Sequence, residues 1–193
     1  EWKSSDPRAV TRWFRNRNDF HSPDCENTDG QFRRIVRLLK AFARSRSSWK
    51  ALTATGFMIT KLADETFVSS VNRDDIALRN IMQAIRQRLE YNKVIQHPTL
   101  HGENITHTAD ARPNYFKERL AENLKHLEVL DQYDCSHASA MAAWDKVFCT
   151  DWFSNQPTPN DEGNGSCRAK IAVAPTRPVE KREGGRYAIW PRV

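Results

Sequence analysis

Residues 32–44, FRRIVRLLKAFAR, carry the most regular pattern in this sequence of 193 residues. Apolar side chains recur there at steps of three and four residues, which places them on one face of an α-helix. They are Phe32, Ile35, Val36, Leu39, Phe42 and Ala43. The other face carries a stripe of cations, namely Arg33, Arg34, Arg37, Lys40 and Arg44. We therefore predict a helix that begins at a cap formed by Thr28 or Asp29 and buries its apolar face in a core.

Further helices are predicted on both sides of this segment. Upstream, Asp6 as N-cap and Pro7 as first helical residue indicate a helix through residues 8–17. Downstream, apolar periodicity predicts four more helices. One follows Gly56 and contains Phe57, Ile59, Leu62, Ala63, Thr66 and Phe67; one starts at Asn72 and carries Ile76, Ile81, Met82, Ile85 and Leu89; the others span 114–133 and 138–148. Residues 21–30 and 91–113 contain turn-forming residues and are predicted to be irregular.

Together these patterns predict a mainly α fold, a helical bundle over residues 1–150. Residues 151–193 are rich in Pro, Gly, Asn and basic residues, which predicts an irregular C-terminal tail. The hydrophobic fraction of 39% and the charged fraction of 28% are ordinary for a globular protein. Since no run approaches the roughly 18 apolar residues of a membrane span, we expect a cytoplasmic protein without a membrane partner.

Neither the cysteines nor the histidines predict a metal site. The cysteines, Cys25, Cys135, Cys149 and Cys167, are far apart and form no CxxC pair, so we expect reduced thiols. Three histidines lie in the predicted irregular segment, at positions 97, 101 and 107. They lack the fixed short spacing on an ordered element that a metal site needs.

Phosphate binding is the chemistry that the residues favour. The net charge of +6 attracts acidic partners such as nucleotides or nucleic acid. Lys40 and Arg44 lie one turn apart on the basic face of the predicted helix. The Thr55 hydroxyl and the backbone after Gly56, where a ligand can approach closely, would meet them at the start of the next helix. We therefore predict a phosphate-binding group made by Lys40, Arg44 and Thr55.

Catalytic residues are not predicted in this chain. The sequence has no Walker-type phosphate loop, no GxSxG motif and no Gly-Ser turn followed by an Asp-x-Asp pair. Such a pair is what a two-magnesium nucleotidyltransferase needs. Asp74 and Asp75 are adjacent instead of alternating, and they stand at a predicted helix start, where carboxylates complement the helix dipole.

Several segments in order resemble one protein family. They are RRIVRLLKAFARS at 33–45, TATGFMITKLADETF at 53–67, DDIALRNIMQAIRQRL at 74–89, HPTLHGENIT at 97–106 and AAWDKVF at 142–148. WKSSDP at 2–7 fits the segment that precedes them. Over residues 1–150 the chain resembles the C-terminal helical lobe of the CD-NTase family. These are bacterial nucleotidyltransferases related to cyclic GMP-AMP synthase and oligoadenylate synthetase, with a polymerase-β-like core.

The resemblance implies a role for three residues. Lys40 matches a lysine that touches the donor triphosphate, Thr55 a small hydroxyl residue that contacts phosphate, and Phe57 an aromatic residue near the base. Thr55 departs from the family's usual serine and lacks a preceding proline. Complete family members use Mg²⁺ and nucleoside triphosphates such as ATP and GTP to make cyclic oligonucleotide signals in antiphage defence.

The family's catalytic carboxylates have no counterpart in this chain, so the resemblance implies that a nucleotidyltransferase half, N-terminal or on a partner chain, holds the Mg²⁺. Two alternatives stay open. The lobe could be a stand-alone module that senses a nucleotide, or a helical domain that binds nucleic acid. The first would bind nucleotide without chemistry, and the second would show a steep salt dependence with long polyanions.

Overall fold

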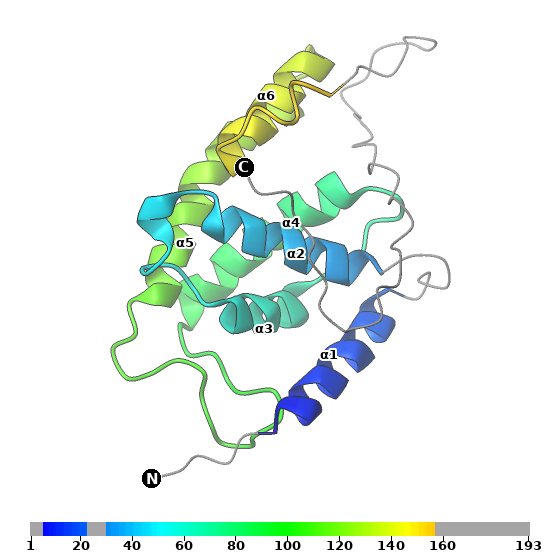
Figure 1. Ribbon diagram of the computed structural model, residues 1–193. Coiled ribbons are helices and arrows are strands. Elements are labelled where there is room, and N and C mark those ends of the chain that lie inside the picture. Colours follow the sequence, from blue (N-terminus) through cyan, green and yellow to red (C-terminus); the bar gives the residue numbers. More distant parts are fainter. Residues whose placement is uncertain (1–5, 23–29, 157–193) are drawn as a thin grey trace, which may run out of the picture.

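The computed structural model describes residues 6–22 and 30–156. Within these ranges the chain is mainly helical and contains no strand; an isolated antiparallel bridge joins Gln96 to Asn104 (Figure 1). The predicted mainly α fold is therefore confirmed. The predicted tail, 151–193, lies outside the described residues apart from 151–156.

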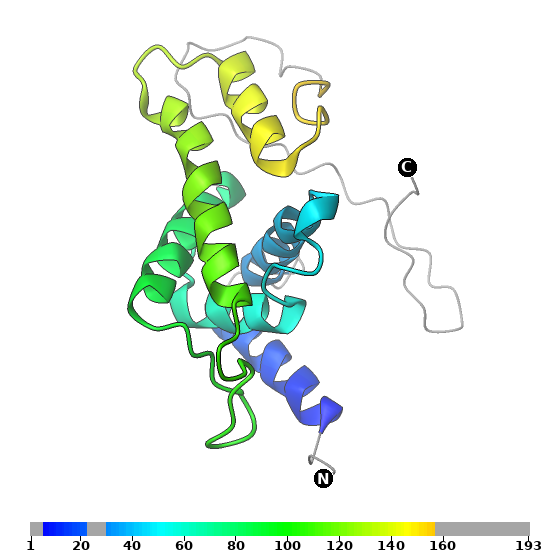
Figure 2. The same ribbon diagram turned by 90° about the vertical axis from the view of Figure 1, so that its left-hand side faces the viewer.

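The helices largely follow the predicted segments. They are α1 (Pro7–His21), α2 (Gln31–Arg44), α3 (Gly56–Thr66), α4 (Asp74–Tyr91), α5 (Arg112–Leu124) and α6 (His137–Phe148), with the 3₁₀ helices η2 (Ser47–Trp49) and η3 (Lys125–Asp131). In both views α1 lies at one end of the molecule and α6 at the other (Figures 1 and 2). None of the helices described is long and apolar enough to cross a membrane.

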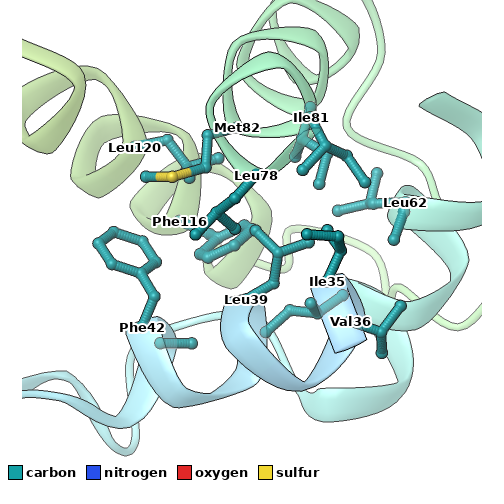
Figure 3. Close-up of a cluster of buried hydrophobic side chains, with 14 of the residues drawn as sticks. Ile35, Val36, Leu39, Phe42, Leu62, Leu78, Ile81, Met82, Phe116 and Leu120 are labelled. Atoms are coloured by element: carbon teal, nitrogen blue, oxygen red, sulfur yellow. The ribbon is translucent and has the colours of Figure 1, made fainter. Parts of the chain in front are cut away.

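The apolar face of α2 forms the centre of the core. All six apolar side chains predicted for this face are buried. Figure 3 shows Ile35, Leu39 and Phe42 of α2 facing side chains from α3, α4 and α5. Helix α4 packs against α2, α3 and α5, so it closes the core on the opposite side. Full burial of each such Leu, Ile or Phe contributes about 1.5–3 kcal/mol.

The start of α1 is capped as the sequence predicts. The Asp6 carboxylate accepts hydrogen bonds from the backbone N–H groups of Arg8, at 2.9 Å, and Ala9, at 3.1 Å. Pro7 occupies the first turn, where it removes no helical hydrogen bond. The helix runs to His21, so the first residue of the predicted loop at 21–30 is helical; residues 23–29 lie outside the described ranges.

The predicted cap of α2 at Thr28 or Asp29 is wrong, because Gly30 is the N-cap residue. Gly30 has a φ of 80° and no side chain to cap the helix. The first N–H groups of α2 are satisfied instead by side chains at the end of α1. Ser22 Oγ accepts from the N–H of Phe32 at 2.9 Å, and Asn18 Oδ1 accepts from the N–H of Arg33 at 3.1 Å. The cap is therefore a tertiary contact between two helices.

This arrangement predicts that Gly30→Ala is more destabilising than Gly102→Ala. Both glycines have a positive φ, 80° and 79°, and an alanine in that region costs about 1 kcal/mol. A Cβ at Gly30 would also lie 2.7 Å from Asn18 Oδ1, whereas nothing lies within 4 Å at Gly102. Displacing the capping Asn18 side chain brings the expected loss for Gly30→Ala to about 3 kcal/mol. Urea unfolding of both variants measures the difference, and equal losses would contradict this account.

Two later predictions need correction. The segment 114–133 is not one helix, because α5 ends at Leu124 and the chain continues as η3. The Asn123 side chain donates to the Arg119 carbonyl at 2.8 Å and so competes with the backbone hydrogen bond there. The helix predicted to start at Asn72 begins at Asp74. Ile76, which was predicted to lie on its apolar side, is 36% exposed.

Helix α6 and the residues after it cover the end of the core near α2. Cys149 ends the helix in the left-handed conformation, with a φ of 53°. The Asp145 carboxylate then accepts hydrogen bonds from the N–H groups of Phe153 and Ser154, both at 2.9 Å. The Phe153 ring consequently packs on Phe148, with 5.6 Å between ring centroids.

Candidate anion-binding site

A pocket of about 390 Å³ lies where the end of α2, the α2–α3 connection, the start of α3 and the start of α5 meet. Its polar lining side chains are Lys40, Arg44, Lys50, Thr53, Thr55 and Arg112. Four of these carry a positive charge and two carry a hydroxyl, while no carboxylate, carboxamide or imidazole of the described residues lines the pocket. The side chains thus offer hydrogen-bond donors to a ligand and place positive charge around it, which suits an anion.

The first turn of α3 points at this pocket. Thr55 is the N-cap, and its Oγ1 accepts a hydrogen bond from the N–H of Met58 at 3.3 Å. The N–H groups of Gly56 and Phe57 have no acceptor in the part of the chain that the structure describes. Unpaired N–H groups and the positive end of the helix dipole make a helix N-terminus attractive to anions.

Lys40 and Arg44 of α2 lie directly against this turn. A Cβ added at Gly56 would be 3.4 Å from Lys40 Cε and 4.0 Å from Arg44 Nη2. Glycine at this position therefore leaves the space in which the two cations approach the backbone of α3. The predicted grouping of Lys40, Arg44 and Thr55 is present in the structure, and all three line the pocket.

Lys40 has no counter-charge among the residues described. Lys40 is half-buried, and neither Lys40 nor Arg44 makes an ion pair or hydrogen bond within residues 6–22 and 30–156. Burial, and then the positive charge of Arg44, lowers the pKa of Lys40 below its ordinary value of 10.5. The folded protein thus holds two like charges together, and a bound anion would relieve their repulsion.

Arg112 reaches the pocket from α5 and is held in place by Asp110. Its Nε donates to Asp110 Oδ1 at 2.8 Å and its Nη2 donates to Oδ2 at 2.7 Å. These hydrogen bonds lower the pKa of Asp110 to about 2. The bidentate pair fixes the plane of the guanidinium, and Nη1 keeps its donors for another group.

Sequence reasoning did not assign Lys50, Thr53 or Arg112 to the site. Lys50 and Thr53 belong to the short connection between α2 and α3, so their closeness to Lys40 was the signal that could have found them. The sequence gives no such signal for Arg112, because this residue is far from Lys40 in the chain and reaches the pocket only through the packing of α5.

Phe57 does not line the pocket. Its half-buried ring packs edge-on against Trp13, at 6.5 Å between ring centroids, and His97, at 5.2 Å. His97 Nδ1 is close to the backbone N–H groups of Thr99 and Leu100, which donate to it at 3.3 and 3.1 Å. This aromatic cluster lies beside the first turn of α3, and the contact of Phe57 with a base stays a prediction.

The carboxylates at the start of α4 form ion pairs within the protein. Arg34 donates to both oxygens of Asp74, and Arg73 does the same to Asp75. Burial would raise the pKa of Asp74, but the hydrogen bonds from Arg34 and Gln31 outweigh it and lower the pKa. Among the residues described, no group of three or more His, Cys, Asp and Glu side chains could hold a metal ion. The pocket's donor set, which lacks carboxylates, does not fit Mg²⁺ either.

No protein-family model matches the sequence, and a comparison with curated proteins finds no similar sequence.

Proposed function

We propose that this pocket binds the triphosphate of a nucleoside triphosphate, ATP or GTP. The observation that carries the proposal is the set of four cations around a helix N-terminus, with no carboxylate from the described residues in the lining. Lys40 and Arg44 supply charge from α2, the Thr55 hydroxyl can donate to a phosphate oxygen, and Gly56 and Phe57 offer backbone N–H groups. A triphosphate carries negative charge along its whole length. Cations that come from separate elements can therefore each contact a different phosphate group.

We further propose that the chain is the helical lobe of a CD-NTase-like enzyme that makes cyclic oligonucleotides in antiphage signalling. The resemblance of segments in residues 1–150 supports this, as does the closeness of Lys40 to Thr55, which the resemblance pairs. In such an enzyme this lobe binds and orients the triphosphate, and Phe57 lies on the side of the base. The catalytic carboxylates belong to a nucleotidyltransferase half outside this chain. The Mg²⁺ bound there would neutralise phosphate charge and steady the leaving pyrophosphate.

A stand-alone nucleotide-sensing module is the second candidate. It is supported by the cations, the hydroxyls and the helix N-terminus that lie together around one pocket within residues 40–112. Nucleic-acid binding has less support, because several arginines on the surface of the helices are paired with carboxylates. These pairs include Arg79 with Asp131 and Arg88 with Glu65.

Calorimetric titration of the 193-residue chain with ATP and GTP in the presence of Mg²⁺ tests the proposal. We expect Lys40→Ala to weaken binding by about ten- to a hundredfold, since a hydrogen bond to a charged group contributes about 1.5–3 kcal/mol. Lys125→Ala is the matched control, because it removes the same charge from an exposed residue of η3 that does not line the pocket. Product analysis of the same mixtures should find no cyclic nucleotide. Equal weakening in the two variants would contradict the site, and cyclic product would contradict the need for a second half.

A further inference from the structure

The hydroxyl of Thr53 has no hydrogen-bond partner among the residues that the structure describes. The residue is only 7% exposed and its Oγ1 is shut off from solvent, yet this atom makes no hydrogen bond in the part of the chain that the structure describes. Buried hydroxyls are nearly always hydrogen-bonded, because an unpaired one costs stability. A buried hydroxyl without a hydrogen-bond partner at the wall of a pocket therefore indicates a ligand that binds there.

The surroundings of Thr53 place it among the groups of the proposed phosphate site. Thr53 lines the same pocket as Lys40, Lys50 and Thr55. Its backbone N–H donates to the Trp49 carbonyl at 3.0 Å, which ties the residue to η2 and fixes the position of its Cβ. A 120° rotation about χ1 moves the hydroxyl to the site of the methyl group, so the hydroxyl can change direction without a change in the backbone.

We propose that Thr53 is a further ligand-binding residue, whose hydroxyl donates a hydrogen bond to an oxygen of the bound phosphate chain. This inference rests on the proposed function, because it concerns the same pocket. It adds Thr53 to the groups that recognise the phosphate chain. The lining side chains are charged donors and hydroxyls, which match phosphate oxygens. Among the described residues the pocket has no carboxylate or carboxamide to accept from the exocyclic amines of a base. The pocket therefore selects a polyphosphate and leaves the choice of base to residues outside it.

Two substitutions at Thr53 separate ligand binding from folding. Thr53→Val keeps the shape and removes only the hydroxyl, while Thr53→Ser keeps the hydroxyl and removes the methyl group. The probe is inorganic tripolyphosphate, titrated into the full chain by calorimetry, with urea unfolding of the unliganded protein alongside. We expect Thr53→Val to bind tripolyphosphate about tenfold more weakly and to unfold at an equal or higher urea concentration. Thr53→Ser should bind within about threefold of the unsubstituted protein.

The other outcomes distinguish this inference from the proposed function. If Thr53→Val binds as tightly as the unsubstituted protein while Lys40→Ala binds weakly, Thr53 is not a ligand-binding residue and the phosphate site stands. If tripolyphosphate binding is insensitive to Lys40→Ala as well, both proposals fail. A lower urea midpoint for Thr53→Val would assign the hydroxyl a structural role and overturn the inference. So would a Thr53→Ser variant that binds as weakly as Thr53→Val.

Discussion

Replacing Phe42 by alanine is expected to lower the free energy of unfolding by about 4 kcal/mol, at the upper end of the range for a buried phenylalanine. The side chain is fully buried, and its ring packs against Trp49, Phe116 and Phe148 at centroid distances of 5.3, 6.3 and 6.5 Å. It thereby joins α2 to η2, α5 and α6. A loss of this size is a large fraction of the about 5–15 kcal/mol that stabilises a typical domain, and urea unfolding measures it directly.

Phe20→Ala is the matched control for this prediction, since it removes the same atoms from a ring that is 70% exposed. Among the described residues, the ring contacts the Arg17 guanidinium and the His21 ring. We expect a change of about 0.5 kcal/mol or less for this surface residue. Similar losses for Phe42→Ala and Phe20→Ala would mean that α2 is not the centre of the core.

Lys40→Met is expected to reduce the affinity for ATP about a hundredfold and, at neutral pH, to stabilise the unliganded protein. The methionine side chain fills a similar volume without the charge, so it removes the repulsion from Arg44 and the unfavourable burial of the ammonium group. Removing the same charge removes the main contact proposed for phosphate. A gain in stability together with a loss of affinity is what we expect when a residue contributes to ligand binding at the expense of folding stability.

The pH dependence of stability checks the origin of this effect. The pKa of Lys40 in the folded protein is below the 10.5 of the ordinary side chain. Between these two values the unfolded chain binds more protons than the folded one, so the stability contributed by this group rises with pH in that interval. Below the folded pKa the destabilisation is constant. Urea unfolding across alkaline pH should therefore show a rise that Lys40→Met lacks, and identical pH profiles would contradict the assigned cause.

The sequence was sufficient to predict the central helix and part of the site. The three- and four-residue spacing of apolar side chains identified every buried residue of that face of α2, and the same geometry placed Lys40 and Arg44 one turn apart. Thr55 could be predicted to lie near these two residues because the chain between the two helices is short and Gly56 allows a close approach. These features depend on local periodicity and on neighbours in the sequence, which a single chain displays.

The features that were missed depend on contacts between distant residues. The cap of α2 comes from Asn18 and Ser22 of α1, and nothing in residues 30–44 indicates those partners. Arg112 reaches the pocket only through the placement of α5, which packs mainly against α4. Thr53 looked like an ordinary turn residue, since an unpaired buried hydroxyl is recognisable only when its whole environment is known.

The central claim is that the pocket at the start of α3 binds a phosphate chain. The most direct test follows the backbone amide resonances of the ¹⁵N-labelled chain by NMR while ATP and Mg²⁺ are added. We predict saturable shifts that are largest at Gly56 and Phe57, whose N–H groups in the first turn of α3 have no acceptor in the described chain, and no shift at the remote Gly102. The largest shifts elsewhere, with the amides of Gly56 and Phe57 unchanged at saturation, would contradict the claim.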